Sequence, residues 1–164
     1  IFPKPIIAAI NGDCVAGGVE LMLASDIRAA APHARFGLPE VRLSIYPFGG
    51  ATVKLIHQIG YVHAMKLILG AELVEAEEAL RIDLINEIID THSLIDWALN
   101  LAETIAANSP SAVQAVKRKI STEIAEHALT QEALDQKLGD AVRHSAHFKE
   151  GVAAFLEKRK PNYD

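Results

Sequence analysis

The sequence has only one cysteine, Cys14, so no disulfide bond can form within its 164 residues. A chain without disulfides fits a reducing compartment, and we expect a cytoplasmic protein. Long apolar runs are also missing, because no stretch reaches the roughly 18 uninterrupted apolar residues that a membrane helix needs. The formal net charge of −5 at pH 7 does not favour binding to nucleic acid or to an anionic membrane.

The remaining composition is that of an ordinary globular protein, with 50% hydrophobic and 23% charged residues. A chain of this length buries roughly 70% of its unfolded surface, which is enough for one sizeable core. It opens on residues 1–6, IFPKPI, with neither an initiator Met nor the layout of a secretory signal. Because a strand-like run begins almost at once, we expect a fragment of a domain, in which a site is only partly present.

Strands and helices alternate in the first half of the sequence, and helices alone follow. Short apolar or extended runs predict strands at 6–10, 27–31, 35–37 and 84–89. Apolar periodicity and cap residues predict helices after Gly17-Gly18, at 53–60, 63–70, 75–81, 93–108 and 110–128, then one capped by Thr130 and one capped by Ser145 that covers 148–159. This order predicts an α/β core followed by a helical tail.

A glycine-rich turn, Asn11 to Glu20, joins the first predicted strand to the first predicted helix. Unpaired N–H groups at the start of a helix, together with the helix dipole, favour negative charge. A phosphate loop needs Lys and Ser or Thr after its second glycine, but Val19 and Glu20 follow Gly18. Two interpretations stay open: the N–H of Gly17 or Gly18 forms an oxyanion hole, or both glycines only permit a tight turn.

Glu20 and Glu40 are the carboxylates with candidate chemistry, because each lies among apolar residues. Desolvation raises the pKa of a carboxyl group, and two nearby carboxylates push their pKa values apart, which suits one acid and one base. The alternative is that Glu20 only favours its helix N-terminus and that Glu40 is a loop residue facing water. The linear spacing does not decide between these interpretations.

The other reactive side chains form no recognisable motif. Cys14 has no identifiable base partner, so a small buried core residue is the preferred interpretation. His144 and His147 have helical spacing but no further ligands, and the basic runs 117–119 and 158–160 are expected to be solvated helix faces and ends. GxSxG, HExxH and CxxC motifs are missing, and no metal site is predicted.

Five segments together carry a resemblance to a known family. They are KPIIAAING at 4–12, AGGVEL at 16–21, SDIR at 25–28, ARFGLPEV at 34–41 and EGVAAFLEKRKP at 150–161. In this order and spacing the chain resembles, over essentially its whole length, the enoyl-CoA hydratase/isomerase (crotonase) family.

The resemblance implies an α/β fold, a crotonase-like spiral of stacked ββα units followed by a C-terminal helical trimerisation region. Residues 1–90 would form the C-terminal part of the spiral core, and residues 91–164 the helical tail and oligomerisation region. It also implies a homotrimer or a dimer of trimers, and a large N-terminal portion of the relatives ahead of the strand at 6–10.

The resemblance further implies an acyl-CoA thioester substrate, whose coenzyme A makes a separate cofactor unnecessary. Gly17 matches the family's second oxyanion-hole glycine, while the first donor comes from a loop upstream of this chain. Glu20 and Glu40 match the acid/base glutamates between which water adds to a trans-2-enoyl-CoA. Lys158 matches a tail lysine that in some relatives approaches the coenzyme A of a neighbouring subunit.

One departure from the family concerns the loop after the second glutamate. Many hydratases carry Pro-Gly there, whereas this chain has Pro47-Phe48 followed by Gly49-Gly50. Phe48 would add a large ring near the acyl pocket, so Pro47 and Phe48 are candidate pocket residues. Retention of both glutamates favours an enoyl-CoA hydratase. The alternatives are an enoyl-CoA isomerase, another crotonase-type lyase or hydrolase, or a catalytically silent assembly or RNA-binding subunit, which only the basic runs support.

Overall fold

The strands form two small sheets in the computed structural model, which describes residues 2–164. The first sheet has the order β1 (Ile7–Ile10), β3 (Ile27–Ala30), β6 (Glu87–Ile88), and all its pairs are parallel. The second has the order β2 (Cys14–Val15), β4 (Arg35–Gly37), β5 (Val74–Glu75), with β2 parallel and β5 antiparallel to β4. The strands predicted at 6–10, 27–31 and 35–37 are thereby confirmed.

Two ββα units follow one another and stack. β1, β2 and helix α1 (Gly17–Met22) form the first unit, and β3, β4 and helix α2 (Ala51–Gly70) form the second, with a 3₁₀ helix, η1 (Pro39–Leu43), before α2. Ile7 pairs with Ile27 and Cys14 with Phe36, so each strand of the first unit lies beside its counterpart in the second. This arrangement confirms the expected spiral of stacked ββα units.

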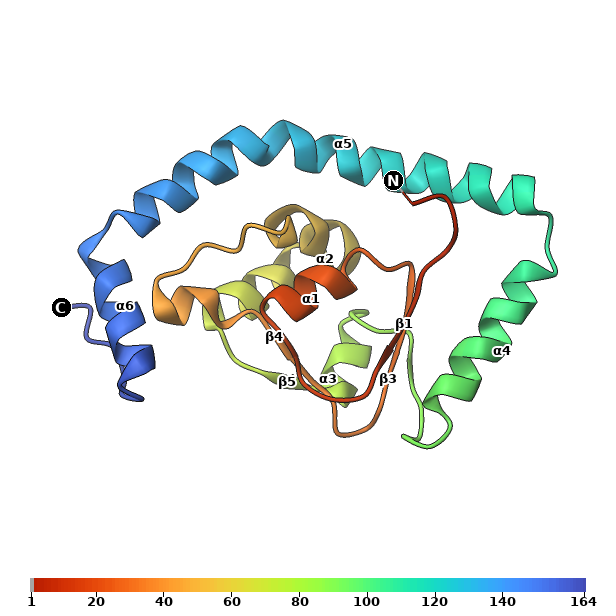
Figure 1. The fold of residues 1–164 in the computed structure, drawn as a ribbon, viewed down its shortest axis with the longest axis horizontal. Helices are drawn as coiled ribbons and strands as arrows, with labels where there is room; N and C mark the ends of the chain where they lie inside the picture. Colours follow the sequence, from red (N-terminus) through yellow and green to blue (C-terminus); the bar gives the residue numbers. More distant parts are fainter. Residues whose placement is uncertain (1) are drawn as a thin grey trace.

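Helices make up most of the remaining chain. They are α3 (Ala76–Arg81), α4 (Leu94–Ala106), α5 (Pro110–Arg143) and α6 (Ala146–Leu156). Figure 1 shows α5 arching along one side of the sheets, with α4 and α6 turning back at its two ends. The predicted break at Gly60 is confirmed, because this residue has φ 76° and ψ 162° and divides α2 into two helical parts.

Of three residues expected to cap helices, only one does so. Thr130 caps no helix: α5 runs through it, and the Thr130 hydroxyl donates to the His127 carbonyl one turn earlier, a bond that a helix interior tolerates. Ser93 precedes α4, but its side chain makes no cap hydrogen bond. By contrast, Ser145 accepts a hydrogen bond from the Phe148 N–H (3.1 Å) and caps α6.

The strand predicted at 84–89 is limited to Glu87–Ile88. The N–H groups of Leu84 and Ile85 donate to the Ala79 carbonyl at the end of α3, and the Asn86 N–H donates to the Arg28 carbonyl. The first two bonds close α3 and use the N–H groups of Leu84 and Ile85, so bonding to β3 begins only at Asn86.

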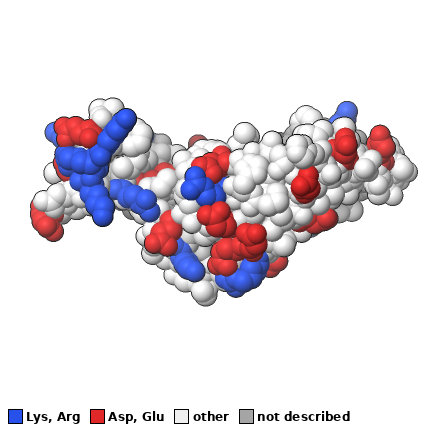
Figure 2. Space-filling view, turned by 90° about the horizontal axis from the view of Figure 1, so that it is seen from below, with Lys and Arg blue, Asp and Glu red and all other residues white. Residues whose placement is uncertain are grey.

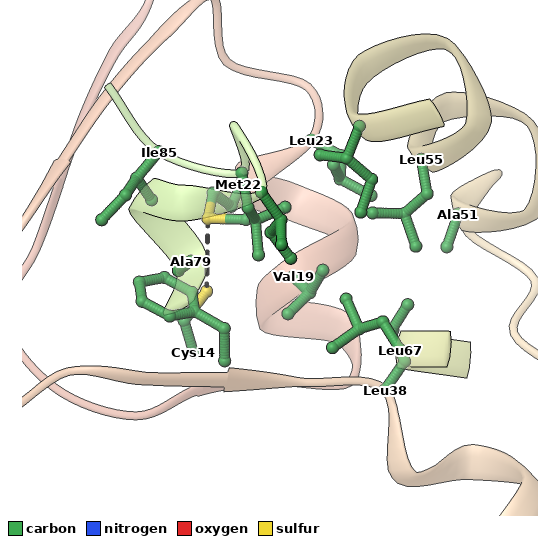
Figure 3. Packing of buried hydrophobic residues seen from close by; sticks show 14 of the residues in the cluster. Cys14, Val19, Met22, Leu23, Leu38, Ala51, Leu55, Leu67, Ala79 and Ile85 are labelled. Carbon is green, nitrogen blue, oxygen red and sulfur yellow. Dashed lines mark hydrogen bonds between the residues drawn. The ribbon is translucent and has the colours of Figure 1, made fainter. Parts of the chain in front are cut away.

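Helix α1 lies at the centre of the main hydrophobic core. Figure 3 shows Val19, Met22 and Leu23 of this helix among side chains from the surrounding elements: Cys14, Leu38, Ala51, Leu55, Leu67, Ala79 and Ile85. Cys14 is buried, as expected, with its Sγ 4.0 Å from the Met22 Sδ, and burial raises the pKa of its thiol. One face of α1 is therefore buried in the core through Val19 and Met22, whereas Leu21 on the helix stays exposed.

A buried guanidinium joins α1, α2 and the segment after α3. Arg28 of β3 is only 7% exposed, and its side chain donates to four oxygens: Ser25 Oγ (3.2 Å), Ser25 O (3.1 Å), Leu84 O (3.2 Å) and Gln58 Oε1 (2.8 Å). All four acceptors are neutral, and burial lowers the pKa of Arg28. The Gln58 amide in turn donates to the Leu23 carbonyl, which connects α2 to the end of α1.

A second buried cation attaches α5 to the first sheet. The Lys117 side chain is 9% exposed, and its Nζ lies 2.7 Å from Asp26 Oδ2 and also donates to the Lys4 carbonyl. The same Asp26 oxygen accepts from the Ile6 N–H at 2.6 Å. The expectation that Lys117 is part of a solvated basic face is therefore wrong, since its side chain is largely covered and binds the carboxylate of Asp26, just before β3.

Replacing Arg28 by Met is expected to lower the free energy of unfolding by about 2–4 kcal/mol, because four buried acceptors lose their donor together. Urea unfolding followed by circular dichroism measures this difference. Arg118→Met, at an exposed position of α5, is the matched control and should stay within about 0.5 kcal/mol of the parent. Equal stability of the two variants would contradict the role given to Arg28.

Candidate active site

The N-terminal turn of α1 begins in an unusual backbone conformation. Ala16 has φ 53° and ψ −122°, a region that costs a residue with a Cβ roughly 1–3 kcal/mol. The Ala16 N–H donates to the Gly37 carbonyl (2.9 Å), so β4 holds the strained residue in place. Among residues 2–164, no hydrogen bond uses the Gly17 N–H, and a Cβ added to Gly17 would meet no atom within 4 Å. Gly17 is exposed, and its N–H lies at the positive end of a short helix.

Glu20 extends from α1 to the loop that precedes α2. Its Oε1 accepts a hydrogen bond from the Gly49 N–H at 2.5 Å. A Cβ on Gly49 would lie 2.5 Å from both Cδ and Oε2 of Glu20, so only glycine allows this close approach. The carboxylate of Glu20 is thus fixed by the loop backbone, which sequence reasoning missed, although the Gly49-Gly50 pair was the available signal.

Glu40, in η1, is buried rather than solvated. It is 9% exposed, and its Oε2 has no hydrogen-bond partner among the described residues. Burial raises the pKa of Glu40, and the negative charge of Glu20 raises it further, against an opposing hydrogen bond from the Glu40 backbone. The alternative of a loop residue facing water is therefore wrong for Glu40. The charge of Glu20 thus acts on Glu40, which lies 20 positions further along the sequence, although no hydrogen bond joins the two groups among the described residues.

The loop 46–50 carries the two candidate pocket residues. Pro47 is buried, while Phe48 is partly exposed and packs its ring against α5, where it meets Gly139. Lys158 follows α6 with a positive φ of 54°, and its exposed side chain makes no hydrogen bond or ion pair within residues 2–164. Because Lys158 is expected to act across a subunit boundary, its role stays a prediction.

The histidine pair near the C-terminus forms no metal site. The His144 Nδ1 lies 2.7 Å from the Asp140 carbonyl oxygen, whereas the His147 ring packs edge-on against Tyr163. The residues from 2 to 164 contain no group of three or more His, Cys, Asp or Glu side chains arranged to hold a metal ion. Charges of both signs are interspersed with wide uncharged areas on the face turned away from α5 (Figure 2).

The site combines an exposed helix N-terminus with two carboxyl groups whose charges interact, and comparison with known sequences identifies the family to which the chain belongs. The profile of the family described as enoyl-CoA hydratase/isomerase matches residues 1–164, the entire chain. The chain belongs to the enoyl-CoA hydratase/isomerase family. The fold expected from the sequence is confirmed by the same comparison and by solved structures of related proteins.

Individual family members agree with this assignment. An enoyl-CoA hydratase of Mycobacterium tuberculosis, EchA19, is 40% identical over 160 residues, which cover 98% of this chain and 60% of the relative. The 2,3-dehydroadipyl-CoA hydratase of Escherichia coli is 38% identical over 99% of this chain and 64% of its own length. The crystal structure of a carnitinyl-CoA hydratase from Mycobacterium avium superposes with a TM-score of 0.92, at 36% identity over 100% of this chain and 64% of that one. The chain thus spans about three fifths of the length of these relatives.

Glu20→Gln is expected to lower the pKa of Glu40, because the substitution removes the neighbouring negative charge that disfavours ionisation of Glu40. Burial remains, so the pKa should stay above the ordinary value of 4.5. Carbon-13 NMR titration of the glutamate carboxyl groups measures both values. Glu132→Gln, on the exposed side of α5, serves as the control. An unchanged Glu40 pKa in Glu20→Gln would contradict the proximity of the two groups.

Proposed function

We propose that the protein is an enoyl-CoA hydratase, which adds water in the syn sense to the double bond of a trans-2-enoyl-CoA thioester. The observation that carries this proposal is the buried Glu40 carboxyl group with an unpartnered Oε2, beside a Glu20 carboxylate that the Gly49 N–H holds. Two adjacent carboxyl groups with different environments are suited to act as one acid and one base.

The reaction assigns a distinct role to each group. A water molecule bound between Glu20 and Glu40 delivers its oxygen to the β-carbon while Glu20 takes a proton from it. Glu40, whose raised pKa favours the protonated form, gives a proton to the α-carbon, and exchange with solvent restores both groups. Since the bound water and the acidic proton lie on one face of the double bond, the addition is syn.

Negative charge develops on the thioester oxygen as the β-carbon is attacked. The Gly17 N–H, unpaired at the start of α1, stabilises this enolate oxygen, and such a donor typically contributes about 3–4 kcal/mol to the transition state. The strained Ala16 orients the N–H in advance. The other N–H donor of the family's oxyanion hole matches no position of this chain, and we expect a segment outside residues 1–164 to supply it.

The substrate class follows from the relatives, whose names share a coenzyme A thioester and differ in the acyl group. They include hydratases of crotonyl-CoA, 2,3-dehydroadipyl-CoA and (E)-benzylidenesuccinyl-CoA. Because coenzyme A enters as part of the substrate, we propose no separate cofactor. Pro47 and Phe48, in the loop next to Glu20, are proposed to limit the acyl pocket, and Lys158 to contact the coenzyme A of a neighbouring subunit.

The competing functions have less support. Isomerisation of the double bond can run on one carboxylate, whereas this chain carries two glutamates whose charges interact, Glu20 and Glu40. An RNA-binding subunit would bind phosphates through the basic runs 117–119 and 158–160. However, Lys117 forms an ion pair with Asp26, and Arg159 forms ion pairs with Glu150 and Glu157. These two cations are thus already paired within the protein, and the net charge of −5 also disfavours binding to phosphates.

Assembly and location remain proposals. Large apolar side chains are exposed on three helices, with Leu21 of α1 at 77%, Val62 of α2 at 75% and Leu156 of α6 at 74%. Surface of this kind is typical of protein interfaces, and we propose a homotrimer or a dimer of trimers. None of the helices among residues 2–164 combines the length and apolar character needed to cross a bilayer. We propose a cytoplasmic location because the single cysteine is free.

Glu20→Gln and Glu40→Gln are each expected to lower kcat for hydration at least about 100-fold, because each removes one proton-transfer group. The assay follows the loss of enoyl-thioester absorbance with the protein at its natural length, and mass analysis of the product separates hydration from isomerisation. Glu103→Gln, at an exposed position of α4, should keep full activity. Unchanged rates in Glu20→Gln and Glu40→Gln, or no turnover of any enoyl-CoA by the parent, would contradict the proposal.

A further inference from the structure

The loop that binds Glu20 is also attached to the C-terminal half of α5. On one side, the Gly49 N–H donates to Glu20. On the other side, Tyr46 and Phe48 turn to α5, so four consecutive residues join the site to a helix almost 90 positions away in sequence. A loop held at both sides has little freedom to move its backbone N–H groups relative to Glu20.

Tyr46 supplies a directed hydrogen bond to α5. Its hydroxyl donates to Asp135 Oδ1 at 2.5 Å, and its ring meets that of Phe48 edge-on, with centroids 5.4 Å apart. Burial and the Asp135 carboxylate raise the pKa of Tyr46 to about 12, so its proton stays in place near neutral pH. Tyr46 therefore acts as a permanent donor to α5.

Phe48 packs against α5 at a position where only glycine leaves room for its ring. Its ring covers Gly139, and a Cβ at position 139 would overlap the Cζ and Cε1 atoms of the ring. The Arg143 guanidinium lies over the same ring, 5.2 Å from its centroid, one turn further along α5. Glycine inside a helix lowers helix propensity, and here it makes room for the aromatic side chain that replaces the glycine of many hydratases.

We propose that Asp135, Gly139 and Arg143 of α5 are positioning residues, which act through Tyr46 and Phe48 to hold Gly49 against Glu20. This inference rests on the proposed hydratase function. None of the three α5 residues touches Glu20 or Glu40 among the described contacts, so their effect on catalysis passes through the loop. Phe48 and Gly139 form a matched pair, in which the large side chain of the loop requires the small one of the helix.

Gly139→Ala tests the matched pair. The new methyl group displaces the Phe48 ring and the loop, and a shift of roughly 1 Å in a catalytic group typically lowers kcat by up to about 100-fold. KM should change less than kcat, because Gly139 itself belongs to no proposed substrate-binding group. The helix propensity of alanine offsets part of the cost of displacing the ring, so the thermal midpoint should fall by no more than about 5 °C. The variant then stays folded at the assay temperature, and loss of folded protein does not explain the loss of activity.

Two controls isolate the contact. In a Phe48→Ala background, adding Gly139→Ala should change kcat by less than about twofold, because no ring remains to be displaced. Gly70→Ala places the same substitution at another helical glycine, where a Cβ meets no atom within 4 Å, and should leave kcat unchanged. Equal losses from Gly139→Ala in both backgrounds, or no loss in either, would overturn the proposal.

A second pair of variants tests Asp135. Asp135→Asn keeps an oxygen that accepts from the Tyr46 hydroxyl, so kcat should stay within about threefold of the parent, whereas Asp135→Ala should lose about tenfold or more. Absorbance titration should report a lower Tyr46 pKa in Asp135→Asn, because the raising charge is gone. Equal kcat values for the two variants would contradict a positioning role for Asp135.

Amide exchange separates this proposal from the proposed function. Gly139→Ala should accelerate hydrogen exchange of the Gly49 N–H by about tenfold or more, and the effect should vanish in the Phe48→Ala background. If the parent protein hydrates no enoyl-CoA, the proposed function fails while the exchange result still decides whether α5 holds the loop. Unchanged exchange in Gly139→Ala would overturn the attachment itself.

Discussion

The buried guanidinium of Arg28 is the interaction on which the arrangement of the site depends. It binds the turn after α1 through Ser25, α2 through Gln58 and the segment after α3 through Leu84. A charge without a carboxylate partner is tolerated in a core only when its donors are satisfied. The turn after α1, α2 and the segment after α3 must therefore keep the positions at which their oxygens reach the guanidinium. Because Glu20 lies on α1 and Gly49 immediately precedes the N-cap of α2, these positions also determine whether the Gly49 N–H reaches Glu20.

The residues of the proposed catalytic site, unlike Arg28, carry local costs in free energy. Glu40 is buried with one oxygen unpartnered, and Ala16 adopts a conformation that costs a non-glycine residue free energy. Both features lower stability, and both occur where the proposed mechanism needs them: a carboxyl group with a raised pKa, and an N–H at the position of a developing charge. A well-satisfied scaffold around Arg28 and Lys117 offsets these local costs, as is common where a fold supports chemistry.

Local chemistry explains which features could be predicted from the sequence. The glycine turn before α1, the break at Gly60 and the Ser145 cap depend on residues within a few positions of each other, and each is confirmed. The apolar neighbours of Glu20 and Glu40 singled out both glutamates, and the resemblance supplied the spiral, whereas spacing alone could not bring the glutamates together. The predicted break at Thr130 failed because its hydroxyl bonds one turn back within α5, and the solvated role given to Lys117 failed because a tertiary contact with Asp26 decides it. The Phe48–Gly139 contact was missed because the two residues lie 91 positions apart.

Isotope labelling tests the central claim most directly. Crotonyl-CoA is incubated with the protein at its natural length in ¹⁸O-labelled heavy water, and the product is analysed by mass spectrometry and NMR. The account predicts one ¹⁸O at the β-carbon and one deuterium at the α-carbon, added to the same face of the double bond. Deuterium in the product without ¹⁸O, or addition to opposite faces, would contradict a water held between Glu20 and Glu40.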